Sequence, residues 1–364
     1  MDVAAALRLP GGDVAGEGRQ PGGDVPEPGR RPTMKDVAVL AGVSLSTVSR
    51  VVNGENARPD LADRVQHAVG MLGYRRDVTA STLRRADRMS ASIGLVVADV
   101  GNPFFAAVLR GVEDVARERG VLGFTGSSDE DPQRERELAH ALVGRRVDGL
   151  IMAPAGDDHS YLLRDRKAGV AMVFVDRPPR YLDADVVLSD NAGGTAVAVG
   201  HLRRRGHRRI AFLGDRERLY TAGERLRAYR ETLIAAGIPI EPALVRLGLD
   251  GVDAAVEATR ALLAAAAPPT AIVAAQNLLT VGAVHALRAA GRQHEVALVG
   301  FDDVPLAAAV DPGITVVAQN PVEMGRRAAE LLFSRLDGHA GPSRSLVVPT
   351  ELIPRGSGEL PGTA

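Results

Sequence analysis

The chain lacks the residues on which several kinds of chemistry depend. Its 364 residues contain no cysteine and no tryptophan, and aromatic residues make up only 3% of the sequence. A chain without cysteine forms no disulfide, thiolate nucleophile or thiolate metal site, which is typical of proteins that work in a reducing cytoplasm. The shortage of aromatic rings leaves few surfaces on which a ring-shaped ligand can stack. We expect these surfaces to come from Phe104, Phe105, Phe174, Tyr181 and Tyr220.

Membrane segments and the common catalytic motifs are also missing. No apolar run approaches the ~18 residues that a membrane span requires. The apolar stretch at residues 3–9 has Arg8 as its only basic residue, and glycine and proline follow it, so it makes a poor secretory signal. The motifs of P-loop nucleotide hydrolases, zinc proteases and ester hydrolases are absent, and the spacing of His201 and His207 does not suit a helical metal site. We therefore expect a cytoplasmic protein with no enzyme activity, cofactor, bound metal or membrane association.

Basic residues are concentrated near the beginning of a chain that is almost neutral as a whole. The formal net charge is −1, yet residues 30–88 hold 11 lysine and arginine residues against 6 aspartate and glutamate residues. Contacts with the phosphates of a nucleic acid need a local excess of this kind. At 364 residues the chain is long enough for two or three domains, so the basic region can form a domain of its own.

The stretch at residues 33–53 predicts two short helices joined by a tight turn. Ala38, Gly42 and Val48 supply a small residue, a residue without a Cβ and an apolar anchor at the spacing of a helix-turn-helix. A third helix, at residues 61–72, has apolar residues at helical spacing and should close a small core with the first two. These patterns predict a small all-α head.

Changes in composition set the domain boundaries. Residues 1–30 are rich in glycine and proline, so we expect a disordered tail or a stretch upstream of the true translation start. The head then covers residues 31–76. Residues 77–90 are expected to form a hinge helix and linker, because a helix this short needs a partner to be stable. The core should follow at residues 91–353, and residues 354–364 should be a tail.

From Ser92 onward, buried-strand runs alternate with amphipathic helices. Such alternation predicts parallel sheets with right-handed crossovers, arranged in two lobes. We place the first lobe at about residues 91–189 plus 319–340, and the second at about residues 190–318 plus 344–353. Ligands of such sheets bind outside the carboxyl ends of the strands. Polar residues recur at these ends, and they are Asp99, Asp176, Arg177, Asp215, Gln276, Asn277, Asp302 and Asp303.

Several longer motifs follow one another along the chain. They include MKDVAVLAGVSLSTVSRVVNG near the start, IGLVVADVGNPFF and VDR in the first lobe, and HLRRRGHRRIAFLGD and GFDD in the second. Over about residues 33–353 this order resembles the lactose-repressor (LacI) family of transcriptional regulators. The resemblance implies a periplasmic-binding-protein-like core joined to the head by a hinge helix. It also implies a ligand-responsive repressor of carbohydrate-related genes that binds a pseudo-palindromic DNA operator as a homodimer, with a tetramer as the alternative.

In the head and hinge, the resemblance assigns DNA contacts to particular positions. Base reading falls to Leu45, Ser46 and Arg50, and Arg50 can donate two hydrogen bonds to a guanine. The phosphate-contacting positions are Thr33, Ser44, Thr47, Ser49 and Asn53. Leu83 matches the hinge leucine that wedges into the minor groove, and Ala80 matches the small residue that lets two hinge helices approach.

In the core, the resemblance implies a cleft for a small polar effector, with a sugar or sugar derivative favoured over a nucleobase. The implied lining residues are Phe104, Phe105, Asp176, Arg177, Arg225, Gln276, Asn277 and Asp302. Arg225 can donate through its forked guanidinium, and Asp302 can accept from hydroxyl groups. The family usually has an Asn-Asp pair where this chain has Gln276 and Asn277.

Other interpretations remain open at this point. A solute-binding protein would share the two-lobed fold, although the basic head and the poor export signal argue against it. Among single residues, Asp176 and Asp302 can be helix caps or turn residues, Arg225 can pair with Glu224, and Leu83 can belong to a minor core.

Overall fold

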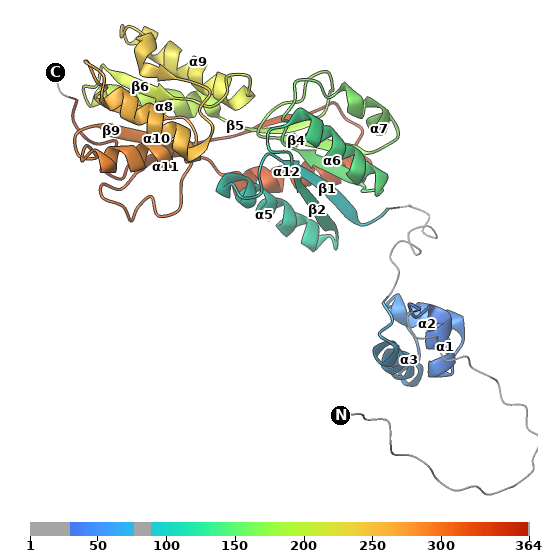
Figure 1. The fold of residues 1–364 in the computed structure, drawn as a ribbon. Coiled ribbons are helices and arrows are strands. Elements are labelled where there is room, and N and C mark those ends of the chain that lie inside the picture. The colour runs from blue at the N-terminus through green and yellow to red at the C-terminus, as the bar shows by residue number, and fades with distance from the viewer. Residues whose placement is uncertain (1–29, 76–88, 363–364) are drawn as a thin grey trace, which may run out of the picture. The chain divides into compact units, whose positions relative to one another are not determined.

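The computed structural model describes residues 30–75 and 89–362, which belong to two compact units. We call residues 30–75 the head and residues 89–362 the core unit, and each is described by itself (Figure 1). The predicted hinge positions Ala80 and Leu83 lie outside the described residues. No helix in the described ranges is long and apolar enough to cross a membrane.

Within residues 30–75, the head consists of α1 (Met34–Ala41), α2 (Leu45–Val52) and α3 (Pro59–Leu72). Thr33 and Asp36 start α1 with a capping box, in which each side chain accepts a hydrogen bond from the other residue's backbone N–H. Gly42 ends α1 in the left-handed region at φ 62°, where a residue with a Cβ would be strained. The predicted turn glycine therefore stands where the helix-turn-helix requires it.

All three helices contribute to a small buried core in the head. Its members are each at most 5% exposed, and they are Val37, Ala41, Val48, Val65 and Ala68. The predicted third helix is present and starts at Pro59 rather than Leu61, because a proline suits the first turn of a helix. The predicted all-α helix-turn-helix head is confirmed.

The first lobe of the core unit is a parallel sheet with helices on both faces. Its strand order is β11-β5-β4-β3-β1-β2. The strands are β1 (Ser92–Val97), β2 (Leu122–Ser127), β3 (Gly149–Met152), β4 (Ala171–Val175), β5 (Asp185–Ser189) and β11 (Ser345–Val348). The helices are α5 (Pro103–Glu118), α6 (Pro132–Gly144), η1 (Ser160–Leu162), α7 (Leu163–Lys167) and α12 (Pro321–Leu336). α5 and α12 pack on one face and α6 packs on the other (Figure 1).

The second lobe repeats this design. Its strand order is β12-β10-β9-β8-β6-β7, and only β12 runs antiparallel to its neighbour. The strands are β6 (Ile210–Leu213), β7 (Val245–Arg246), β8 (Ala271–Ala274), β9 (Ala297–Phe301), β10 (Thr315–Ala318) and β12 (Glu351–Ile353). The helices are α8 (Asn191–Arg204), α9 (Tyr220–Ala235), η2 (Pro242–Leu244), α10 (Gly251–Leu263) and α11 (Asn277–Ala289). The predicted two-lobed α/β architecture with parallel sheets is confirmed.

The last part of the chain departs from the prediction. We expected residues 344–353 to lie in the second lobe. β12 does pair with β10 of the second sheet, but β11 pairs in parallel with β5 of the first sheet. We expected residues 354–364 to be a tail, but the described part packs on the second lobe. There His201 Nε2 lies 2.9 Å from the carboxylate of Glu359 and 3.0 Å from the carbonyl oxygen of Gly358. Gly358 and Glu359 lie 157 and 158 positions after His201, so no local sequence pattern predicts these contacts.

Candidate functional site

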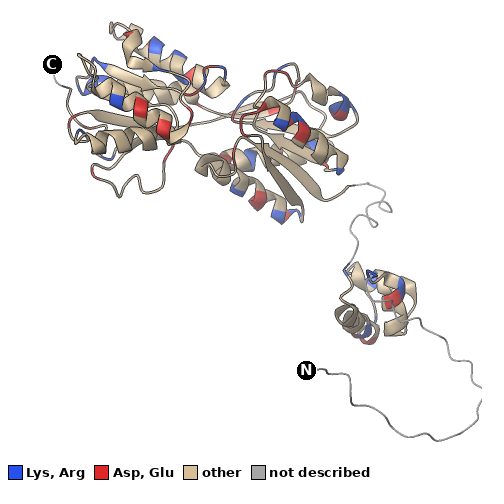
Figure 2. Cartoon of the chain, viewed as in Figure 1, with Lys and Arg blue, Asp and Glu red and all other residues tan. Residues whose placement is uncertain are grey.

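The second helix of the head presents its predicted base-reading residues to solvent. Leu45 is 44% exposed, and Ser46 and Arg50 are also exposed. Val48 faces the opposite way and is fully buried, which fixes the orientation of α2. Among the described residues, no side-chain hydrogen bond or ion pair involves Arg50, so its guanidinium is free to bind an external acceptor. The head also has more basic than acidic residues, which Figure 2 marks.

Four of the five predicted phosphate-contacting residues lie in α2 or cap its ends, and the fifth caps α1. Ser44 caps α2 by accepting from the backbone N–H of Thr47 at 3.1 Å, and the two hydroxyl oxygens lie 2.8 Å apart. At the other end of α2, Asn53 Nδ2 donates to Ser49 Oγ at 3.2 Å. Thr33 caps α1. These short-range bonds orient hydroxyl and amide groups that can also bind phosphate oxygens.

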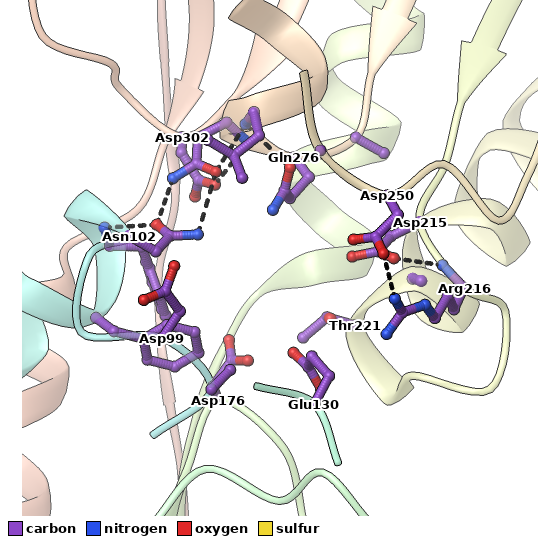
Figure 3. A pocket seen from close by; sticks show the side chains of 18 of the residues that line it. Asp99, Asn102, Glu130, Asp176, Asp215, Arg216, Thr221, Asp250, Gln276 and Asp302 are labelled. Atoms are coloured by element: carbon purple, nitrogen blue, oxygen red, sulfur yellow. Dashed lines mark hydrogen bonds and ion pairs between the residues drawn. The ribbon is translucent and has the colours of Figure 1, made fainter. Parts of the chain in front are cut away.

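A cavity of about 280 Å³ lies between the two lobes of the core unit (Figure 3). All eight predicted effector residues line it. They meet because the carboxyl ends of parallel strands lie at the same edge of a sheet. Asp176 and Arg177 follow β4, Gln276 follows β8 and Asp302 follows β9. Phe104 and Phe105 lie in the first turn of α5, which Asn102 caps.

Arg177 is fixed in the cavity by several partners in the first lobe. Its Nη1 and Nη2 each donate to a carboxylate oxygen of Glu130 at 2.7 Å, and Nη1 also donates to the carbonyl oxygen of Pro154 at 2.9 Å. Its Nε lies 3.2 Å from Asp176. Burial opposes the charge of Arg177, but the hydrogen bonds and charge of Glu130, with the charge of Asp176, raise its pKa. Burial raises the pKa of Asp176 despite the opposite charges of Arg177 and Arg225.

Arg225, from α9, enters the cavity from the second lobe and is 4% exposed. Its Nε donates to Asn191 Oδ1 and its Nη1 to the carbonyl oxygen of Ala275, both at 2.7 Å. Its guanidinium stacks on the Phe301 ring, 3.7 Å from the centroid. Burial lowers the pKa of Arg225, against the opposing charge of Asp302. The alternative pair with Glu224 does not form, because Glu224 pairs with Arg227 at 2.7 Å.

The remaining predicted residues form a polar chain along the second-lobe wall. Asp302 accepts from the backbone N–H of Asn277 at 3.2 Å and from the side chain of Gln319. Asn277 Nδ2 donates across the cleft to Asn102 Oδ1 at 2.7 Å. Gln276 has a capping role, because its Oε1 accepts from the first backbone N–H groups of α11. Both lobes therefore contribute polar groups to one cavity.

Several polar residues that line the cavity were not predicted from the sequence. They are Asn102, Asp129, Glu130, Arg216, Thr221, Asp250 and Gln319, while Asp99 and Asp215 were noted only as strand-end residues. Five of them also follow the carboxyl end of a strand within a few residues, where ligands of parallel sheets bind. Asp129 and Glu130 follow β2, Arg216 follows β6, Asp250 follows β7 and Gln319 follows β10.

A helix-turn-helix head joined in one chain to a two-lobed, ligand-sized cleft defines the class of ligand-binding transcriptional regulators. Residues 33–77 match the model of the bacterial regulatory proteins of the lacI family, and residues 199–358 match that of the periplasmic binding protein-like domain. The HTH-type transcriptional regulator CelR of Thermobifida fusca is 36% identical over 337 residues, which cover 90% of this chain and 98% of CelR. The chain belongs to the LacI family and is a DNA-binding transcriptional regulator rather than an enzyme.

Other similar proteins have the same organisation. The HTH-type transcriptional repressor CytR of Escherichia coli K12 is 29% identical, with 89% of this chain and 96% of CytR covered. A solved complex of the regulator CelR with cellobiose is 35% identical, covers 90% of this chain and all of that one, and has a TM-score of 0.66. The lac repressor dimer, solved with its operator and an anti-inducer, shares the fold with a TM-score of 0.79 at 24% identity, over 90% of this chain and 99% of that one.

Proposed function

We propose that this protein is a cytoplasmic, ligand-responsive repressor of carbohydrate-related genes that binds a pseudo-palindromic operator as a homodimer. The observation that supports it best is the cavity in the core unit, where charged and polar side chains from both lobes surround a space of about 280 Å³. A ligand that contacts both lobes favours one arrangement of the lobes over others. Such a ligand can shift DNA affinity only through different binding to the two arrangements.

In this proposal, DNA is read by the exposed face of α2. Arg50 makes the main base contact, Leu45 offers apolar contact and Ser46 can donate or accept. Thr33, Ser44, Thr47, Ser49 and Asn53 hold the head on the phosphates. Ala80 and Leu83 keep their predicted hinge roles, which the described residues do not test.

The cavity favours an uncharged effector with many hydroxyl groups. Seven carboxylate residues and three arginines line it. Two of the arginines, Arg177 and Arg216, are already bonded to the lining acids Glu130 and Asp250. A phosphate or carboxylate on the ligand would therefore meet net negative charge, whereas hydroxyl groups can donate to these acids. Cellobiose, which occupies the similar regulator CelR, is an uncharged molecule of this kind.

An exposed sheet edge supports association of two chains. β2 is one of the two edge strands of the first lobe, and Leu122 and Phe124 on it are 69% and 47% exposed. An exposed edge with large apolar side chains is a typical site of pairing with another protein surface. A second copy of the chain is the partner that a two-fold symmetric operator requires.

A mobility-shift titration tests both parts of this function. Full-length protein is titrated on DNA from its own promoter region, with and without cellobiose, ribose and ribose 5-phosphate. We expect specific binding that an uncharged sugar changes and the sugar phosphate does not. Binding that no sugar changes would disprove the ligand switch and leave the DNA function standing. In parallel, a bound sugar at 100 times its Kd should stabilise the core unit by about 2.7 kcal/mol in thermal unfolding.

The second candidate, a solute-binding protein without a regulatory role, is supported by the two-lobed core alone. It gives no reason for the exposed Arg50 on α2 of the head. A protein that binds sugar but shows no specific DNA binding at low salt would favour this candidate.

A further inference from the structure

Arg218 joins the two lobes from a position beside the cavity. It lies in the second lobe, between β6 and α9, and it does not belong to the cavity lining. Its Nη1 donates to the carbonyl oxygen of Ala155 at 2.9 Å, and its Nη2 donates to that of Glu130 at 3.1 Å. Ala155 and Glu130 both belong to the first lobe. One guanidinium therefore connects the second lobe to two separate segments of the first.

We propose that Arg218 is a positioning residue that clasps the lobes together and thereby holds the cavity residue Arg177 in place. Two acceptors on different segments suit the planar, forked guanidinium, whereas a lysine ammonium on its flexible stem does not match this geometry. The other side-chain bond across the cleft described above, between Asn102 and Asn277, lies in the cavity lining, where a ligand can compete for it. Arg218 is thus the contact that can favour closure without touching the ligand.

The first-lobe segment that receives Arg218 is fixed from its inner side. Glu135, on α6, is fully buried, and its carboxylate accepts from the backbone N–H of Ala155 and from the hydroxyl of Tyr161 at 2.8 Å. His159 Nε2 lies 3.4 Å from the same carboxylate. Ala155 is therefore held through its N–H by Glu135 and through its carbonyl by Arg218. An acceptor that is already ordered reduces the entropy lost when the clasp forms.

The clasp and the cavity share the residue Glu130. Its carbonyl accepts from Arg218, while its carboxylate binds both terminal nitrogens of Arg177. Glu130 has φ 58°, a conformation that a residue with a Cβ adopts only when its surroundings hold it. Arg177 and Arg218 also bind neighbouring carbonyls, those of Pro154 and Ala155. Release of Arg218 should therefore loosen two of the supports that orient Arg177.

The absence of cysteine makes the clasp directly testable. Lys167→Cys in the first lobe and Ile234→Cys in the second introduce two exposed positions for spin labels in the full-length chain. Electron-spin distance measurements on labelled chains diluted with unlabelled protein report the separation of the lobes. We expect Arg218→Ala to move population toward longer distances, with about a tenfold change in the ratio of separated to clasped lobes. Arg218→Lys should give an intermediate distribution.

Matched variants separate the clasp from general effects. Arg203→Ala removes an exposed arginine of α8, in the same lobe, which has no side-chain bond to the first lobe among the described residues. It should leave the distances unchanged. If Arg218→Ala does not fold, as judged by thermal unfolding, Arg218→Gln takes its place in the same distance measurement. Unchanged distances in the Arg218 variants, or an equal shift in Arg203→Ala, would overturn the proposal.

The proposal depends on the proposed function at one point, namely that closure of the cleft controls DNA binding. The distances are measured without DNA or sugar, so failure of the sugar response does not alter the result. Conversely, unchanged distances reject the clasp and leave the repressor function intact.

Discussion

The head and the core unit hold their candidate binding residues in opposite ways. On α2, the side chains bond only to residues within four positions, and Arg50 is exposed and unpaired among the described residues. In the cavity, Arg177 and Arg225 are less than 10% exposed and bond to partners 23 to 50 positions away. Substitution of an exposed, unpaired residue of α2 such as Arg50 should therefore affect binding alone, whereas substitutions of the buried arginines of the cavity should affect binding and folding together.

The largest effect is expected from Arg225→Ala. It should weaken effector binding by about 100-fold and destabilise the core unit by about 3 kcal/mol, because it leaves buried oxygens of Asn191 and Ala275 without a donor. Calorimetry with the effector sugar measures both quantities. Arg227→Ala, on the exposed side of the same helix, should change neither. An Arg225→Ala variant with unchanged affinity and stability would contradict the expectation that cavity residues contribute to both binding and folding.

Arg50→Ala should weaken specific operator binding by about 10- to 100-fold and leave the thermal unfolding of the core unit unchanged. The reason is that Arg50 has no side-chain partner to lose among the described residues. Mobility shifts on operator and scrambled DNA distinguish base reading from phosphate contact. Arg58→Ala, in the head but outside α2, should reduce both affinities slightly and equally. Equal losses for Arg50→Ala on the two DNAs would contradict its assignment as a base reader.

Val48→Ala should destabilise the head by about 2 kcal/mol, because Val48 is fully buried in a core of five residues. A unit this small has little stability to lose, so we expect its unfolding transition to move well below that of the core unit. Val173→Ala, equally buried in the first lobe, is the comparison. If the two variants lower the unfolding temperature of their own units by the same amount, the head is not the less stable unit that we expect.

Gly42→Ala should destabilise the head by about 1 kcal/mol. Alanine is strained at φ 62°, and the new Cβ would lie 2.5 Å from Arg64 Nη2, which now donates to the Gly42 carbonyl. Gly70→Ala in α3 is a control of opposite sign, since its φ is ordinary and the space around it is open. Chemical unfolding of the head measures both, and a stabilising Gly42→Ala would refute the turn assignment.

The smallest expected effect is the pH dependence that Glu135 gives to the core unit. Burial opposes ionisation of Glu135, but the nearby His159 and the hydrogen bonds from Ala155 and Tyr161 lower its pKa below the ordinary 4.5. The unfolded chain therefore binds the proton first, so this stabilisation is full above about pH 4.5 and is lost as pH falls through the folded pKa. Urea unfolding between about pH 6 and 3 should show a shallower loss for Glu135→Gln. Parallel pH curves for the two proteins would exclude Glu135 as the cause.

Patterns in the sequence predicted the helix-turn-helix and much of the cavity lining. The helix-turn-helix followed from Ala38, Gly42 and Val48, because turn chemistry and helical spacing act over a few residues. The eight cavity residues came from family motifs, most of which lie at the carboxyl ends of strands. Glu130 was missed because no residue after the edge strand β2 was considered, although the carboxyl end of β2 also lies at the cavity.

Contacts between distant segments were out of reach of these patterns. Residues 358–360 bind His201 and His207 of the second lobe, and β11 joins the first sheet after α12. Arg218 looks like an ordinary loop arginine in the sequence, and only the arrangement of the lobes brings it to Ala155. No spacing rule covers pairs that are 63 or more positions apart.

The sequence by itself thus determined the class of protein, the two kinds of unit and the strand ends that line the cavity. It could do so because helix caps, turns and hydrophobic periods depend on neighbouring residues. Only the tertiary structure decided which charges in the cavity are already paired, which lobe receives each late strand, and how Arg218 connects the lobes. These depend on three-dimensional proximity between segments that the chain itself keeps far apart.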